Sequence, residues 1–333
     1  MHFLDSKNWY KKYTEIEEDS SGIEIHHVYI ESWWYKWIHI NPWHCYLLTW
    51  HHFKEIRKQF QPTILHSNFV GVCSISTMWL ARKYQLKFVI TEHWTRVHQY
   101  MRHNKLSFLG KKAYNNADAI TVVSHFLGEV VGNYVHDKGK IIQIPNVIDP
   151  SIFSFRPKET TRELIFTFVG HLKLPKLPLL VVHVVNKIAK ERKEKITLFL
   201  FGEGPLEQTI RSMMPSLSFE VRLMGLRPKK EVAEALQKST LYLHASTYET
   251  FCVAIAEALS TGTPVVASDT TAIPELIHHS NGVLAKNEEQ EWADAISKAL
   301  TLDFHHSAIA FSVHNRYSYP AIGKHFADLY ATL

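Results

Sequence analysis

Two glutamates eight residues apart frame the part of the chain whose residue types best fit ligand binding. Glu249 lies in the loop after a predicted strand, LYLHAS, and Glu257 lies in the helix predicted next, VAIAEALSTG. The first turn of that helix, near Thr250 to Val253, offers unpaired backbone N–H groups, where phosphates bind. Carboxylates accept hydrogen bonds from paired sugar hydroxyls. The spacing therefore predicts a site for a ligand with a sugar, a diphosphate and a ribose, and leaves two solvated glutamates as the alternative.

The elements that must position these residues alternate between strand and helix. In the first half the pattern predicts strands at 23–30, 63–68, 87–94, 119–124 and 140–148, and helices at 51–60, 72–84, 108–117 and after Ser124 as N-cap. From residue 162 it predicts strands at 163–170, 196–202, 220–225, 241–246, 264–268 and 282–287, and helices at 178–193, 205–214, 228–239, 253–262, 272–280 and 289–300. Such alternation is typical of parallel sheets covered by helices. Ligands of these folds bind beyond the C-terminal ends of the strands.

The segment LYLHASTYETFCVAIAEALSTGTPVV, residues 241–266, resembles the donor-site signature of retaining glycosyltransferase family 4. That signature is a Glu, seven residues, a second Glu, and then a small residue, Gly and Pro-Val-Val. The resemblance implies the GT-B architecture, an α/β fold of two Rossmann-like domains that face each other across a cleft. It also implies that Glu249 contacts the transferred sugar and that Glu257 binds the ribose.

Other segments extend the resemblance over residues 60–333. FTFVGHLKLPKLPLLVV matches the family's strand, loop and helix around the donor diphosphate, with Lys176 at the place of its lysine and His171 where arginine is usual. LFLFGEGPLEQTI matches a Gly-x-Gly-Pro turn, and FVITEHW matches a strand that ends in a histidine facing the cleft, here His93. The resemblance thus implies Glu249 and His93 as catalytic residues. The donor-binding residues it implies are Glu257, Lys176, His171, Gly170, Thr250, Phe251, Cys252, Val253, Gly202, Leu226 and Arg227.

The resemblance divides the sequence into two expected domains and a C-terminal helix. Residues 1–155 are expected to form the acceptor-side domain, 156–304 the nucleotide-sugar domain, and 305–333 a helix that crosses back to the first domain. The family's opening strand and glycine-rich loop have no counterpart here, since the first glycine is Gly22. We therefore expect an incomplete N-terminal domain.

The predicted activity is sugar transfer from a nucleoside-diphosphate sugar to a glycan or lipid-linked acceptor, in surface polysaccharide synthesis. Two alternatives stay open: a sugar-nucleotide-binding protein without catalysis, and another enzyme of this architecture, such as a nucleotide-sugar epimerase or a phosphorylase. No cofactor or metal is expected, because no DxD motif stands at a strand end.

Composition narrows the partners and the location. The net charge of +5 suits phosphate-bearing ligands, but no nucleic-acid-binding signature accompanies it. The three cysteines are widely spaced, which predicts reduced thiols, and the N-terminus lacks the apolar core of a signal peptide. We therefore expect a cytoplasmic protein.

The aromatic and basic stretch WWYKWIHINPWH, residues 33–44, has two interpretations. Trp and Tyr favour the membrane interface and cations favour anionic lipid, so the stretch fits a peripheral contact with the inner face of the cell membrane. An aromatic-rich loop packed on the first domain is the alternative.

Overall fold

The computed structural model describes residues 11–18, 22–31, 41–158 and 162–333. The contacts between residues divide the chain into two compact units, one of residues 1–90 with 103–118 and one of residues 91–102 with 119–333. The domain limits expected at residues 155 and 304, and the return of 305–333 to the first domain, stay predictions.

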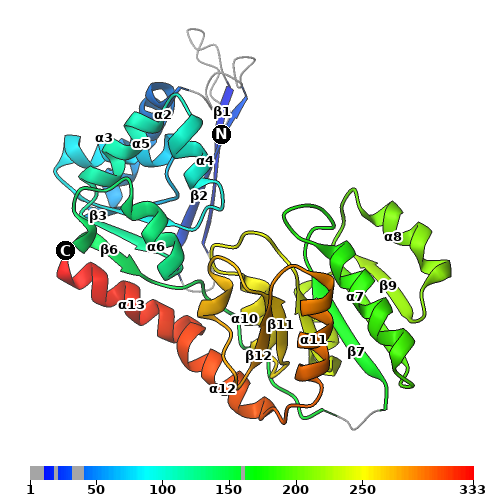
Figure 1. Cartoon of the computed structure of the whole chain (residues 1–333). Coiled ribbons are helices and arrows are strands. Elements are labelled where there is room, and N and C mark those ends of the chain that lie inside the picture. Colours follow the sequence, from blue (N-terminus) through cyan, green and yellow to red (C-terminus); the bar gives the residue numbers. More distant parts are fainter. Residues whose placement is uncertain (1–10, 19–21, 32–40, 159–161) are drawn as a thin grey trace. The chain divides into compact units, whose positions relative to one another are not determined.

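The six-stranded sheet of the second unit is parallel throughout, in the order β12-β11-β10-β7-β8-β9 (Figure 1). Its strands are β7 (Leu164–Val169), β8 (Ile196–Phe201), β9 (Glu220–Gly225), β10 (Leu241–His244), β11 (Val265–Ser268) and β12 (Gly282–Ala285). The chain adds β8 and β9 on one side of β7 and then returns to the other side with β10. The exits of β7 and β10 therefore diverge, and this topological switch point is where open α/β sheets bind ligands.

Helices connect the strands of this sheet and cover it. They are α7 (Pro178–Glu191), α8 (Glu207–Met213), α9 (Lys229–Lys238), α10 (Val253–Ser260) and α11 (Glu289–Ala299). Helix α7 packs against α11 (Figure 1), and α9 packs against α10. Because both faces are covered, the central strands are apolar almost without interruption, and every residue of β10 and β11 is buried.

A four-stranded sheet has the order β3-β4-β5-β6. Its strands are β3 (Ile64–Asn68), β4 (Lys87–Glu92), β5 (Ala119–Val122) and β6 (Ile141–Gln143), and the accompanying helices are α3 (Val72–Tyr84), α4 (Val97–His103), α5 (Ser107–Asn116) and α6 (His125–Gly132). The predicted cap is confirmed, since Ser124 Oγ accepts a hydrogen bond of 3.1 Å from the Leu127 N–H. Helix α4 was not predicted, and β6 ends well before residue 148 because Pro145 cannot donate to a ladder.

The strand predicted at 23–30 exists as β2 (Glu24–Glu31), but its expected place in a parallel sheet is wrong. It pairs antiparallel with β1 (Lys11–Glu18), from Lys11 opposite Glu31 to Glu18 opposite Glu24, in a separate two-stranded sheet. Its sequence, EIHHVYIE, places polar and apolar residues on both faces, which suits an antiparallel ribbon better than a strand covered on both faces, whose residues are apolar almost without interruption.

Two predicted helices also need correction. Helix α2 (Pro42–Gln59) begins nine residues before the predicted start, because Pro42 opens the helix where a break was expected and Asn41 Oδ1 caps the Trp43 N–H at 3.0 Å. The helix expected at 272–280 is reduced to the short turn η3 (Ile273–Glu275). There the Asn281 side chain bonds the His278 N–H at 2.7 Å and the Leu276 carbonyl at 3.0 Å, which gives the backbone partners outside a helix.

The C-terminal segment forms two helices, α12 (His306–Tyr317) and α13 (Tyr319–Thr332), which meet at Ser318. Pro320 in the first turn of α13 suits the start of a helix, so the pattern read as one helix is split there. Within the described ranges, no helix combines the length and apolar character needed to cross a bilayer.

Candidate functional site

Backbone hydrogen bonds join the loops that leave β7 and β10 at the switch point. The Leu177 N–H donates to the Ala245 carbonyl at 3.1 Å, and the Thr247 N–H donates to the Pro175 carbonyl at 3.0 Å. Lys176, between them in the first loop, forms an antiparallel bridge with Ser246 in the second. These bonds bring the Lys176 side chain to Glu249.

Two glycines allow the exits of β7 and β8 to approach each other. Gly202 has φ +120°, and a Cβ atom there would lie 2.1 Å from the Gly170 carbonyl oxygen. A Cβ on Gly204 would lie 2.5 Å from the Leu172 carbonyl oxygen. Only glycine fits such backbone contacts, so Gly202 and Gly204 hold in place the loop that carries Lys176.

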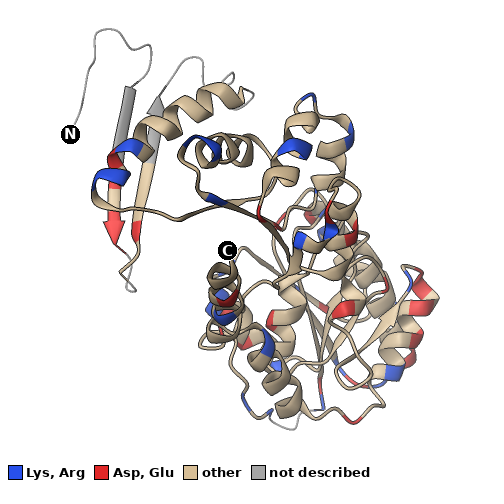
Figure 2. Cartoon of the chain, turned by 90° about the vertical axis from the view of Figure 1, so that its left-hand side faces the viewer, with Lys and Arg blue, Asp and Glu red and all other residues tan. Residues whose placement is uncertain are grey.

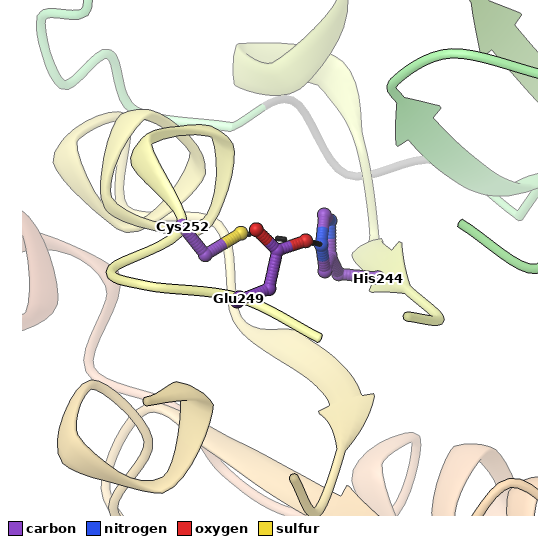
Figure 3. Close-up of side chains that lie close together, drawn as sticks. All are labelled: His244, Glu249 and Cys252. Atoms are coloured by element: carbon purple, nitrogen blue, oxygen red, sulfur yellow. Dashed lines mark hydrogen bonds and ion pairs between the residues drawn. The ribbon is translucent and has the colours of Figure 1, made fainter. Parts of the chain in front are cut away.

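A buried cluster surrounds the Glu249 carboxylate (Figure 3). His244 Nε2 lies 2.9 Å from Glu249 Oε1. The Lys176 ammonium forms an ion pair with the same oxygen. Lys176 Nζ is also 3.4 Å from His244 Nε2. Glu249 is 7% exposed and His244 is fully buried, so solvent screens these contacts little.

The pKa values of the cluster show how its charges are arranged. Burial opposes ionisation of Glu249, but the hydrogen bond with His244 and the charge of Lys176 outweigh it and lower the pKa of this carboxyl to about 2. Burial lowers the pKa of His244. At neutral pH the Glu249 carboxyl is therefore ionised and the His244 imidazole is neutral.

Cys252 completes the cluster as the N-cap of α10. Its backbone is left-handed, with φ 73°, and its Sγ lies 3.2 Å from His244 Nε2. The ligand-type atoms of His244, Glu249 and Cys252 lie within 4.8 Å of one another. However, the Lys176 ammonium already supplies the charge that a cation would bring, and burial raises the pKa of the Cys252 thiol, whereas zinc takes a thiolate. We therefore interpret the group as an ion-pair network.

The first turn of α10 presents donors beside this network. No described residue accepts a hydrogen bond from the N–H groups of Val253 or Ala254, as expected for the start of a helix. Just before it, the Thr250 hydroxyl donates to the His93 carbonyl at 3.1 Å. The His93 side chain is half-buried, which lowers its pKa. The structure thus brings His93 next to the predicted phosphate-binding turn.

Glu257 lies in the middle of α10, one turn and more beyond these donors. Burial raises the pKa of its carboxyl to about 7, although the Lys229 ammonium at 3.9 Å acts in the opposite direction. Hydrogen-bond donors of a ligand would stabilise the ionised form of this carboxyl and lower its pKa.

The other predicted site residues divide into exposed and buried ones. His171 is exposed, and Leu226 is 70% exposed. Arg227 Nε donates to the Met224 carbonyl at 2.9 Å. Phe251 is buried with its ring edge-to-face against Tyr317, so it supports the turn before α10. The ligand-binding roles of all these residues stay predictions.

Two residues were not anticipated from the sequence: His244 of the cluster, and Tyr242, whose Oη lies 2.9 Å from His244 Nδ1. Tyr242 and His244 occur in the apolar strand β10, which we interpreted only as a buried strand. The available signal was their spacing, since two polar aromatic side chains at positions i and i+2 share one face of a strand.

Two family models match the chain. The model described as Glycosyltransferase Family 4 matches residues 13–152, and the model described as Glycosyl transferases group 1 matches residues 151–311. Together they cover all strands of the four-stranded and six-stranded sheets.

Two curated relatives have comparable identity. N-acetyl-alpha-D-glucosaminyl L-malate synthase of Bacillus anthracis is 27% identical over 238 residues, which are 68% of this chain and 62% of that protein. The phosphatidylinositol N-acetylglucosaminyltransferase gpi3 subunit of Schizosaccharomyces pombe is 25% identical over 197 residues, which are 57% of this chain and 42% of that protein. The chain thus spans less than two thirds of the length of these relatives.

Among solved structures, HepE of Anabaena in complex with UDP superposes with a TM-score of 0.71 at 16% identity. The superposition covers 85% of this chain and 82% of HepE. At this identity the likeness concerns the fold, and it confirms the expected GT-B class.

Proposed function

The chain belongs to glycosyltransferase family 4, and from this premise we propose that it moves a sugar from a nucleoside-diphosphate sugar to an acceptor hydroxyl with retention of configuration. One observation carries the proposal. Lys176 and Glu249, from loops that diverge at the switch point, meet beside the first turn of α10. A cation, a carboxylate and free amide donors in one place match the three parts of a sugar diphosphate.

We assign the parts of the donor to these groups by their chemistry. Its diphosphate accepts hydrogen bonds from the N–H groups of Val253 and Ala254 and is paired with Lys176. The Glu249 carboxylate accepts from hydroxyls of the sugar, and Glu257 accepts from the ribose hydroxyls. The nucleobase lies toward the loop of Leu226 and Arg227, and the loop of Gly170 and His171 closes the phosphate side.

The reaction requires stabilisation of the negative charge that develops on the leaving diphosphate. The bond between the sugar's anomeric carbon and the β-phosphate oxygen breaks, and negative charge grows on the departing diphosphate. Lys176 and the positive end of α10 stabilise that charge without a metal ion in this proposal. The acceptor oxygen bonds the oxocarbenium-like carbon from the same face, and its proton passes to the departing phosphate oxygen. His93, next to Thr250, lines the acceptor side.

The names of the relatives suggest which sugar to try first. Both curated relatives are named for the transfer or synthesis of an N-acetylglucosaminyl group. We therefore propose an N-acetylhexosamine or a hexose as the transferred sugar and a glycan or lipid-linked hydroxyl as acceptor.

The proposed activity is tested by release of UDP or GDP from UDP-N-acetylglucosamine, UDP-glucose and GDP-mannose, with and without acceptor alcohols. We expect release from one donor that rises with acceptor, together with a glycoside product of retained configuration. Conversion of the donor without acceptor would instead identify an epimerase. Tight donor binding without any turnover would identify a binding protein.

We also propose that the first unit contacts the cytoplasmic face of an anionic membrane. Trp33, Trp34 and Trp37 of the predicted aromatic stretch lie outside the described residues. In its described part, Trp43 is 55% exposed, and its ring contacts those of Tyr46 and Trp79. Helix α2 also bears three basic residues, at 54, 57 and 58, against one acidic residue. Figure 2 marks the basic and acidic positions along the described chain by colour.

Membrane contact predicts flotation with vesicles that contain phosphatidylglycerol. We expect a Trp33→Ala, Trp34→Ala, Trp37→Ala variant to lose most of the floated fraction, because aromatic side chains anchor at the interface. The variant Trp292→Phe, at a buried position of α11, serves as the control. Equal flotation of the triple variant and the control would remove this part of the proposal.

A further inference from the structure

A line of hydrogen-bonded side chains leads from the centre of the six-stranded sheet to Glu249. Tyr242 Oη lies 2.9 Å from His244 Nδ1, and His244 Nε2 lies 2.9 Å from Glu249 Oε1. Tyr242 and His244 are both fully buried in β10, and the His244 ring stacks on Phe168 of β7 at 6.4 Å between centroids. The imidazole is therefore held by packing as well as by its two nitrogens.

The direction of each hydrogen bond follows from the ionisation of the ends. Glu249 is a carboxylate, which can only accept, so the imidazole proton must be on Nε2. His244 Nδ1 is then an acceptor, and the Tyr242 hydroxyl, which burial keeps protonated, lies 2.9 Å from it and 3.3 Å from a second acceptor, the Val169 carbonyl. One tautomer of a neutral histidine is thus selected from both sides.

The bonds of this line converge on one oxygen of the carboxylate. Oε1 accepts from His244 and is paired with Lys176, whereas no described residue is hydrogen-bonded to Oε2. In Figure 3 one carboxylate oxygen faces the His244 ring and the other points toward the side of Cys252. Holding Oε1 on two sides fixes the rotation of the carboxylate about its last bond, and hence the direction of Oε2.

We propose that Tyr242 and His244 are positioning residues that aim Oε2 of Glu249 at a hydroxyl of the donor sugar. This inference rests on the proposed function, because it assigns the sugar to Glu249. Neither residue touches the nucleotide in this arrangement. The nucleotide is held by α10, Lys176 and Glu257.

Variants that keep the rings but remove the polar atoms test this inference. His244→Phe keeps an aromatic ring on Phe168, and Tyr242→Phe removes only the hydroxyl. We expect both to lower kcat by about 10- to 100-fold, as loss of an orienting partner does elsewhere. The Kd for UDP or GDP, whichever the wild type binds, is expected to change by less than about threefold, because the nucleotide contacts stay in place. His244→Gln, whose amide can still donate to Glu249, should recover most of kcat.

His314→Phe is the matched control. His314 is partly buried and does not belong to the cluster. The substitution removes its hydrogen bond of 2.8 Å between Nε2 and Ser260 Oγ. We expect a drop in thermal stability in this variant with kcat unchanged. The inference is overturned if His244→Phe and Tyr242→Phe keep wild-type kcat, or if kcat and nucleotide affinity fall together in them. A wild type that binds no nucleotide and releases none would instead refute the proposed function.

Discussion

The Lys176→Met variant is expected to lose about three orders of magnitude in kcat/KM. Lys176 is the cation next to both Glu249 and the first turn of α10, so its removal takes charge stabilisation from the leaving diphosphate. Loss of one preorganised donor to a developing negative charge costs about 100- to 1000-fold in other enzymes, and weaker donor binding adds to this. Steady-state kinetics with the donor found in the release assay measure the loss.

A double variant separates this catalytic loss from instability. Lys176→Met leaves Glu249 as a buried carboxylate without its cation, which should cost about 3 kcal/mol, the low end for a broken buried pair, since Lys176 keeps some exposure. Glu249→Gln leaves the ammonium unpaired and should cost a similar amount. The double variant removes both charges, so its free energy of unfolding should return close to that of the wild type while activity stays lost.

Lys173→Met provides the control, because Lys173 lies in the same loop but is exposed. We expect it to keep kcat/KM within about threefold of the wild type. If Lys176→Met also kept its activity, or if the double variant regained it, Lys176 would not stabilise the leaving group.

The sequence predicted the elements of the parallel sheets well, because their signals are local. Strands covered on both faces are continuous apolar runs, as in β8 and β11, and Ser124 marks the start of α6 by a short-range bond. Helix boundaries were predicted wrongly where a residue type can either end or begin a helix. Pro42 can break a helix or begin one, and only the Asn41 cap decides between these.

The site was predictable only as far as its motif reaches along the chain. Glu249 and Glu257 belong to one run of sequence, and the resemblance supplied Lys176. That Lys176 is paired with Glu249 depends on the strand order, since 73 residues separate them and only the return of the chain beside β7 brings them together. Tyr242 and His244 were missed because the sequence of a buried strand does not show which residue its polar side chains contact.

The Glu257→Gln variant should bind nucleotide more weakly and yet be more stable in alkaline solution. Ionised Glu257 accepts hydrogen bonds from ribose hydroxyls in the proposal, and bonds to a charged group contribute about 1.5–3 kcal/mol each. The glutamine amide keeps the shape but loses the charge. We therefore expect the Kd for the nucleotide to rise about 10- to 100-fold near pH 8, measured by calorimetry.

The sign of the stability change follows from the raised pKa of Glu257, about 7 in the folded chain against 4.5 for an ordinary glutamate. The folded protein binds the Glu257 proton more tightly than the unfolded chain does. The stabilisation that results from this proton is therefore fully present below the ordinary glutamate pKa of 4.5. It is lost as the pH rises through about 7, by up to about 3 kcal/mol. Glutamine cannot ionise, so the variant should escape this loss and unfold at a higher temperature than the wild type near pH 8.

The same ionisation gives the wild type a pH-dependent affinity. As the pH rises from about 6 to 8, Glu257 becomes charged and its bonds to the ribose strengthen, so the nucleotide should bind more tightly. The terminal phosphate of the nucleotide also ionises in this range, but it does so equally with the Gln variant, and the difference between the two pH profiles isolates Glu257. Glu234→Gln, at an exposed position of α9, should follow the wild-type profile. Parallel profiles for Glu257→Gln and the wild type would show that the ribose lies elsewhere, because no other described group of this site has a pKa near 7 raised by burial.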